Sequence, residues 1–202
     1  MKQDWKPGTM IYPLPTVMVS CGTTPEEYNI TTVNYVGTLC GNPPLCYISL
    51  KPETHSYDII KRNMEFVINL TSKDLAKWAD WCGIRSGKHN NKFEATKLTP
   101  GKSNVINTPI IEESPLSLEC RVKEIVELGS HHMFIAEVVN VQADNRFFDV
   151  TTGQFEMDKA NLIAFAHGNY YELTNHVGKF GWSVEKKRPN TSKTGKKRSS
   201  KK

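Results

Sequence analysis

The residues best suited to chemistry lie in one short turn, between Lys51 and Ser56. Lys51 carries a full positive charge, Thr54 and Ser56 carry hydroxyl groups, and His55 adds an imidazole. Ser56 is a favourable N-cap, and Asp58 falls in the first turn of the short helix expected there. Because a helix N-terminus offers unpaired N–H groups and partial positive charge, this turn could hold a phosphate. An ordinary capped turn has the same composition, and that simpler interpretation stays open on these residues alone.

The segments around this turn have the pattern of β-strands. Residues 45–50 and 66–70 flank it, and in the first of these runs apolar and polar side chains alternate with a period of two. Residues 17–21 and 28–33 are rich in β-branched side chains and are expected to form the two preceding strands. Residues 34–42 contain two glycines and predict either a plain surface loop or a close approach of the backbone to a ligand.

Downstream, strands continue to dominate. Residues 73–81 have helical spacing and predict an amphipathic helix that ends at Gly83. Residues 83–100 are polar and irregular, with one helical turn expected at 90–96. The later expected strands are 105–106, 110–111, 116–126, 132–141 and 162–166. The fold class predicted is mainly β with inserted helices, arranged as a closed or split antiparallel barrel.

Composition and charge divide the chain of 202 residues into three parts. Residues 186–202 hold nine Lys and Arg and no acidic residue, so removing them from the formal charge of +5 leaves the body at about −4. The body therefore shows no basic footprint for nucleic acid. We expect an N-terminal arm at 1–12, one domain at 13–184, and a disordered basic tail at 185–202 that could attract RNA or an anionic surface.

The cysteines and the chain start favour a cytoplasmic protein. The five cysteines form no C-x-x-C pair and are odd in number, which argues for reduced thiols. The sequence begins without the apolar segment of a signal peptide, and no run is long enough to span a membrane. A metal site is not expected, because His131 and His132 would point to opposite faces of a strand and the other histidines lack ligands at metal spacing.

Several enzyme signatures are absent from the sequence. There is no G-x-G-x-x-G opening a helix, and therefore no separate nicotinamide-binding Rossmann unit. There is also no G-x-x-x-x-G-K-[ST] phosphate loop and no G-x-S-x-G nucleophile elbow. These absences exclude the commonest nucleotide-binding and hydrolase designs.

An ordered set of motifs runs through most of the chain. It comprises Asn29 with Thr31-Thr32, Pro43-Pro44, Ser49 to Lys51, Thr54 to Ser56, Glu65 to Asn69, Cys82-Gly83 with Ser86-Gly87, Lys92-Phe93, Leu118 to Cys120 and Gly129 to Val138. In order and spacing this set resembles the flavin reductase-like family, which includes the flavoredoxins. The resemblance covers roughly residues 13–173. It implies a split β-barrel of the FMN-binding type.

The resemblance also implies where a cofactor binds. The residues that it implies for FMN are Asn29, Thr31, Thr32, Val33, Ser49, Leu50, Lys51, Thr54, His55, Ser56, Cys82, Ser86 and Lys92. No catalytic residue is assigned, but His167 with Tyr170, and His131 or His132, are candidates to border the open face of the ring. Thr54 departs from the family pattern, in which many members carry Arg, and this leaves Lys51 as the one fixed cation of the turn.

The function that follows is an FMN-binding oxidoreductase. It would pass reducing equivalents from NAD(P)H, or from a redox partner protein, through bound FMN. The resemblance implies a homodimer and allows a protein electron acceptor. A non-catalytic flavin- or haem-binding barrel is the alternative, and a scaffold whose tail binds RNA is a third. The sequence does not distinguish NADH from NADPH, or a tightly bound FMN from one that is released.

Overall fold

A curved seven-stranded antiparallel sheet forms the body of the protein. The computed structural model describes residues 1–185, and the predicted tail at 186–202 lies outside the described residues. The strand order is β3-β2-β6-β9-β10-β5-β4. The bounds are β2 Val17–Cys21, β3 Asn29–Val33, β4 Val36–Gly41, β5 Pro44–Leu50, β6 Glu65–Leu70, β9 Leu116–Glu127 and β10 His132–Ala143. β3 and β4 follow one another in the chain but lie at opposite edges of the sheet, so the barrel is split.

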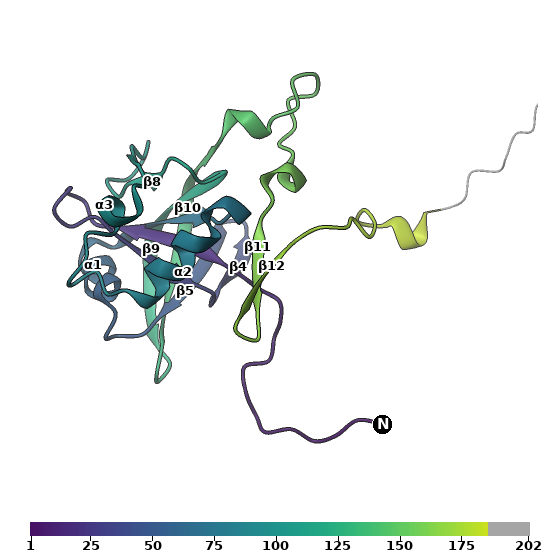
Figure 1. Ribbon diagram of the computed structural model, residues 1–202, viewed down its shortest axis with the longest axis horizontal. Helices are drawn as coiled ribbons and strands as arrows, with labels where there is room; N and C mark the ends of the chain where they lie inside the picture. The colour runs from purple at the N-terminus through teal and green to yellow at the C-terminus, as the bar shows by residue number, and fades with distance from the viewer. Residues whose placement is uncertain (186–202) are drawn as a thin grey trace, which may run out of the picture.

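Smaller elements surround this sheet, as Figure 1 shows. A three-stranded sheet has the order β1-β11-β12, and a two-stranded sheet pairs β7 with β8. The strand bounds are β1 Leu14–Pro15, β7 Pro100–Gly101, β8 Ile110–Ile111, β11 Ile163–Ala166 and β12 Asn169–Glu172. The α-helices are α1 His55–Asn63, α2 Ala76–Ile84 and α3 Lys92–Thr96, and the 3-10 helices are Lys73–Leu75, Asn145–Phe147, Met157–Ala160 and Trp182–Val184. The mainly β architecture with inserted helices is confirmed.

Two apolar clusters hold the body together. The first fills the barrel, where the inward face of β5 places Cys46, Ile48 and Leu50 beside Phe66 and Phe134. This burial follows the period-two pattern of the sequence. The second cluster lies under α2 and α3 and contains Met18, Ile30, Leu75, Ala79, Cys82 and Phe93. The second cluster fixes α2 and α3 to the outer side of β2 and β3.

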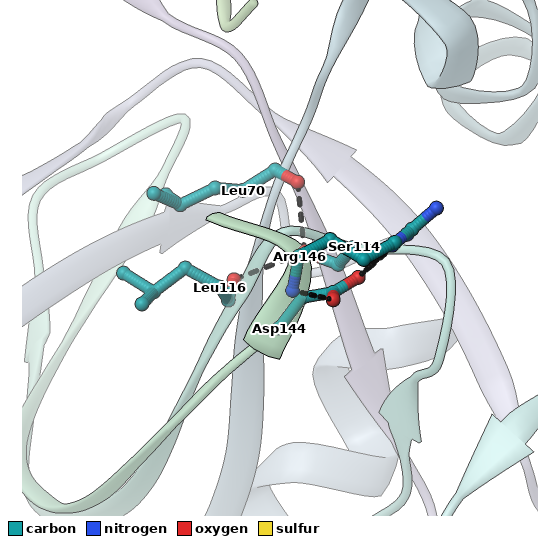
Figure 2. Close-up of polar contacts among 5 residues, drawn as sticks. All are labelled: Leu70, Ser114, Leu116, Asp144 and Arg146. Carbon is teal, nitrogen blue, oxygen red and sulfur yellow. Dashed lines mark hydrogen bonds and ion pairs between the residues drawn. The ribbon is translucent and has the colours of Figure 1, made fainter. Parts of the chain in front are cut away.

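Buried polar groups fix the long connections. Glu119 is fully buried and accepts backbone N–H bonds from Asn104 at 2.9 Å and Val105 at 2.8 Å. Burial alone would raise the pKa of Glu119, but these bonds and those from side-chain amides lower it, so the carboxylate stays charged. Figure 2 shows a second such point, where the Ser114 hydroxyl donates to the carbonyls of Leu70 at 2.8 Å and Leu116 at 2.9 Å.

The loop after β10 is held by an ion pair within its own residues. Figure 2 shows the Asp144 carboxylate accepting bonds from the backbone N–H of Arg146 and from its guanidinium, the first at 2.8 Å. The arginine side chain is mostly exposed, so the pair contributes little to stability and mainly sets the direction of the chain.

Several expectations about elements were wrong. Helix α1 begins at His55 with Thr54 as N-cap, so Ser56 is a helical residue and not the cap. Helix α2 continues through Gly83 to Ile84, because Gly83 lies against Thr32 and has no left-handed φ that would end the helix. Residues 105–106 form no strand, since Glu119 takes their N–H groups. Residues 34–42 are not a plain loop, because β4 pairs there with β5.

No helix in the described part of the chain is long and apolar enough to cross a membrane. The five cysteines are free thiols, and no cluster of three metal-ligating side chains occurs within residues 1–185.

Candidate functional site

Two adjoining cavities lie beside the split edge of the barrel. The larger cavity has a volume of about 490 Å³ and is lined by Tyr12, Leu14, Thr31, Thr32, Val33, Asn34, Tyr35, Ser49, Leu50, Lys51, Thr54, Gly83, His131 and Phe165. The smaller cavity has a volume of about 190 Å³ and is lined by Asn29, Thr31, Glu53, Thr54, His55, Ser56, Cys82, Gly83, Ile84, Arg85, Ser86, Gly87 and Lys92. Thr31, Thr54 and Gly83 line both, so the two cavities share part of their walls.

The smaller cavity contains a buried cation. Lys92 begins α3 and is 3% exposed, and its ammonium donates to the carbonyls of Ile30 at 2.7 Å and Cys82 at 2.6 Å. Burial lowers the pKa of Lys92. No carboxylate lies within ion-pair distance of it among residues 1–185. Because an ammonium has three N–H donors and a buried unpaired charge is costly, this cavity favours an anionic ligand.

The walls of the smaller cavity are closely packed. The Asn29 amide donates to the Ser56 hydroxyl at 2.8 Å, which fixes the first turn of α1 against β3. Gly87 packs on both Asn29 and His55, where a Cβ atom would come within 2.8 Å of the His55 ring. Burial lowers the pKa of His55, and the charges of Lys88 and Lys92 lower it further. The imidazole is therefore neutral at pH 7 and can donate one hydrogen bond.

Positive charge reaches this cavity from an element outside the predicted turn. Arg85 follows α2 and lines the smaller cavity, where it joins the buried Lys92. Arg85 and Lys92 are therefore two cations of this cavity that lie outside the turn containing Thr54. Lys51, which was expected to be the one fixed cation, lies in the wall of the larger cavity.

The lining of the larger cavity is partly aromatic. The end of β3 and the loop after it form one wall, and residues 49–51 form another. The Tyr35 ring lies 5.2 Å from the His131 ring, and the Thr32 hydroxyl bonds to the Ala79 carbonyl. Gly83 fits there because a Cβ atom would come within 3.2 Å of Thr32. A volume of about 490 Å³ falls within the usual range for small-molecule and cofactor pockets.

The structure brings together every residue that the resemblance implied for a cofactor. Each of the thirteen lines at least one of the two cavities. Those that line the smaller cavity are Asn29, Thr31, Thr54, His55, Ser56, Cys82, Ser86 and Lys92. Their contact with a cofactor remains a prediction. The residues missed were Tyr12, Leu14, Asn34, Tyr35, Glu53, Gly83, Ile84, Arg85, Gly87 and Phe165. Of these, Gly83 and Gly87 carried a signal, since two glycines beside motif residues indicate close approach.

The histidine candidates are separated in space. His131 lines the larger cavity, whereas His132 points away and bonds to the Tyr57 hydroxyl at 2.8 Å. His167 lies at the tip of the β11–β12 hairpin and lines neither cavity. Its partner in the prediction, Tyr170, donates instead to Asp80 at 3.2 Å and ties the hairpin to α2.

The structure defines a split antiparallel barrel with two adjoining cavities, one of which contains a buried lysine. The chain belongs to the flavin reductase-like family, because the family model described as "flavin reductase like domain" matches residues 9–174. This confirms the family inferred from the motifs.

Individual relatives agree with the family. An uncharacterised protein of Archaeoglobus fulgidus is 32% identical over 69% of this chain and 77% of its own. The structure of flavoredoxin from Desulfovibrio vulgaris (Miyazaki F) matches with a TM-score of 0.84 and 27% identity, over 92% of this chain and all of that one. A protein of Rhizobium rhizogenes named FMN reductase (NADH) RutF 2 is 23% identical over 58% of this chain and 72% of its own.

Proposed function

We propose that the protein binds FMN and passes reducing equivalents through it, from NAD(P)H or from a redox partner protein. The phosphate lies in the smaller cavity, and the flavin ring lies in the larger one. The observation that carries this proposal is Lys92, a buried cation without an anionic partner in the described chain, beside a cavity of ring size. A flavin mononucleotide supplies both an anion and a planar ring.

The residues of the smaller cavity would anchor the phosphate. The remaining N–H of Lys92 and the Arg85 guanidinium supply charge, and the neutral His55 supplies a hydrogen bond. The N-terminus of α1 adds unpaired backbone N–H groups at His55 and Ser56. Because Ser56 and Asn29 are already bonded to each other, the anchor is rigid before a ligand arrives.

The residues of the larger cavity would orient the ring. Backbone and side chains of residues 31–33 and 49–51 lie along it, and Lys51 stands at its exposed rim. Flavin supplies the acceptance and release of hydride or electrons by its own chemistry. The chain contributes position: it covers one side of the ring and leaves room for a reductant to approach the other, so rate depends on proximity and orientation.

The relatives support this assignment at the level of the class. One relative is named FMN reductase (NADH), and one similar structure is that of a flavoredoxin. We propose a cytoplasmic homodimer in which residues 13–184 form the folded unit. The matched family region, residues 9–174, is close to these bounds.

The spectrum of the purified protein tests the proposal. Titration with FMN should give a bound flavin spectrum and saturable heat at micromolar concentrations, and NADH or NADPH should bleach it faster than free flavin. A protein that is colourless after incubation with FMN and removal of the free flavin overturns the proposal. Bound FMN without reduction above the free-flavin background, in stopped flow, would instead indicate the non-catalytic flavin carrier.

A further inference from the structure

The N-terminal segment forms part of the wall of the larger cavity. Figure 1 shows it passing beside the β11–β12 hairpin on its way from the body. Leu14 pairs with Phe165 through β1, and both line the cavity. Tyr12 also lines the cavity, although it lies outside any strand. The side of the cavity nearest the chain start therefore depends on a segment with little backbone support.

Two contacts hold this segment in place. The Thr9 hydroxyl lies 3.1 Å from the Tyr35 hydroxyl. The Tyr12 ring stacks on the His167 ring at 5.5 Å with an interplanar angle of 29°, and Trp5 lies 6.4 Å from the same histidine. We call the Thr9–Tyr35 and Tyr12–His167 contacts the arm clasp. Both end on a tyrosine of the cavity wall, so releasing the clasp changes the wall itself.

Both contacts of the arm clasp are weak. Thr9 and His167 are exposed, and exposed polar or ring contacts contribute little compared with buried ones. Residues 1–12 have no helix or strand hydrogen bonds to resist opening. Segments with few buried contacts open at low free energy.

His167 adopts a conformation that most residues avoid. Its φ of 52° lies in the left-handed region, and Gly168 follows with φ 80°, which together make the hairpin turn. Asn and Asp would suit this backbone as well as His does. Turn geometry therefore does not require an aromatic ring here, and the ring serves the contact with Tyr12.

We propose that Tyr12 is a specificity-determining residue of the ring cavity and that His167 is a positioning residue acting through Tyr12. With the clasp closed, small planar molecules reach the bound ring and bulky reactants are kept away. With the clasp open, larger reactants approach. This inference rests on the proposed function, since it assigns a role relative to the ring held in the larger cavity.

The test compares four variants of the full chain. Tyr12→Ala removes the wall, His167→Asn keeps the turn but removes the ring, and His167→Phe restores a ring as the conservative rescue. His176→Asn is the matched control, because His176 is exposed and lines neither cavity. Each protein is loaded with FMN and reduced with stoichiometric dithionite. Its reoxidation is timed with p-benzoquinone, which takes two electrons and two protons, and with ferricytochrome c, two of which take one electron each.

The ratio of the two rates measures specificity. In Tyr12→Ala and His167→Asn the ferricytochrome c rate should rise about fivefold to tenfold, because loss of one exposed ring contact shifts the open fraction by that order. In His167→Asn, at a residue that lines neither cavity, the quinone rate should change less than about twofold on the same reasoning. His167→Phe and His176→Asn should match the wild type. An unchanged ratio in Tyr12→Ala overturns the specificity role, and an unchanged ratio in His167→Asn, which keeps the turn, overturns the positioning role.

A measurement without flavin separates this inference from the proposed function. Chymotrypsin can cut after Trp5, whereas Pro13 protects the bond after Tyr12. Mass spectrometry should show faster cleavage after Trp5 in His167→Asn than in the wild type or His167→Phe. If the wild type binds no FMN but this difference appears, the flavin assignment fails and the clasp is supported. Equal cleavage in all variants overturns the clasp.

Discussion

The two cavities of the site are built by opposite means. The walls of the smaller cavity are fixed by buried polar side chains: Asn29 is 3% exposed, Ser56 1% and Lys92 3%. The mouth of the larger cavity, by which we mean Tyr12, Tyr35, His131 and Phe165, is made by exposed or half-buried rings. Tyr35, for example, is 36% exposed. Hydrogen bonds in the first region join elements far apart in sequence, whereas those in the second lie at the surface.

This difference separates two tasks. A rigid, charged cavity contributes affinity, because its groups are already ordered and lose little entropy on binding. A mouth held by weak contacts controls which molecules enter, because it opens at low cost. We therefore expect changes in the smaller cavity to act on FMN affinity and changes at the mouth to act on access.

The largest effect is expected from Lys92→Met. Loss of the buried ammonium removes a charge-assisted bond to the phosphate, worth about 1.5–3 kcal/mol, and weakens FMN binding roughly 10- to 100-fold. Riboflavin, which has no phosphate, should bind the variant within about twofold of the wild type, since no such bond is lost. Isothermal titration with both ligands measures this.

The matched control for this change is Lys97→Met. Lys97 follows the same helix, is exposed, and lines neither the larger nor the smaller cavity. Its FMN affinity should equal that of the wild type. Equal weakening of FMN and riboflavin by Lys92→Met would show that the residue shapes the fold and does not anchor the phosphate.

The next effect is expected from Gly87→Ala. The added Cβ meets the Asn29 amide and the His55 ring, and because both are held by packing the loop must shift. Overpacking of this kind costs about 1–3 kcal/mol of stability and should weaken FMN binding by up to roughly tenfold. Gly41→Ala is the control, since nothing lies within 4 Å of its Cβ position. Thermal melts and FMN titrations of both variants measure the effect. Equal losses in the two variants would show that the close packing around Gly87 is not the cause.

The sequence predicted the rigid region better than the mouth. Asn29, Ser56 and Lys92 lie inside motifs of the family, and their contacts depend on strands and helices whose patterning was clear. The placement of Ser56 as N-cap was nevertheless wrong, because Thr54, two residues earlier, is also a favoured cap residue and the helix begins directly after it. Local propensity does not choose between such neighbours.

The sequence did not predict most of the residues of the mouth, and the physical reason is different. Leu14 and Phe165 meet because β1 pairs with β11, which is far away in the chain, and a strand of two residues leaves no periodic signal. The β4 strand was read as a loop because its glycines and small polar side chains do not favour strands, yet pairing with β5 overrides that preference. The position of His167 depends on the pairing of β11 with β12.

The pH dependence of the smaller cavity provides a finer test. The pKa of His55 is lowered from 6.5 by burial and by Lys88 and Lys92, so the folded protein binds fewer protons there than the unfolded chain. Stability of the flavin-free protein should therefore fall as pH drops through 6.5 toward the lower folded pKa. In His55→Gln the decrease in Tm between about pH 7.5 and about pH 5.5 should be smaller.

Binding of an anion beside His55 should oppose the lowering of its pKa. A phosphate beside His55 favours the imidazolium, so FMN binding near pH 6 should take up protons, and calorimetry in two buffers of different ionisation enthalpy measures the uptake. The uptake should decrease in His55→Gln. The same uptake in both proteins would place the titrating group elsewhere.

The smallest effect is expected at the mouth, from Tyr35→Phe. The change removes the hydroxyl that contacts Thr9 and leaves the ring beside His131. An exposed hydrogen bond contributes about 0.5–1 kcal/mol, so chymotrypsin should cut after Trp5 about twofold to fivefold faster, while FMN affinity stays within twofold. Tyr171→Phe is the control, because Tyr171 is 53% exposed and lies on β12 outside both cavities. A large loss of FMN affinity in Tyr35→Phe would contradict the division of tasks, since it would give the mouth a share in holding the cofactor.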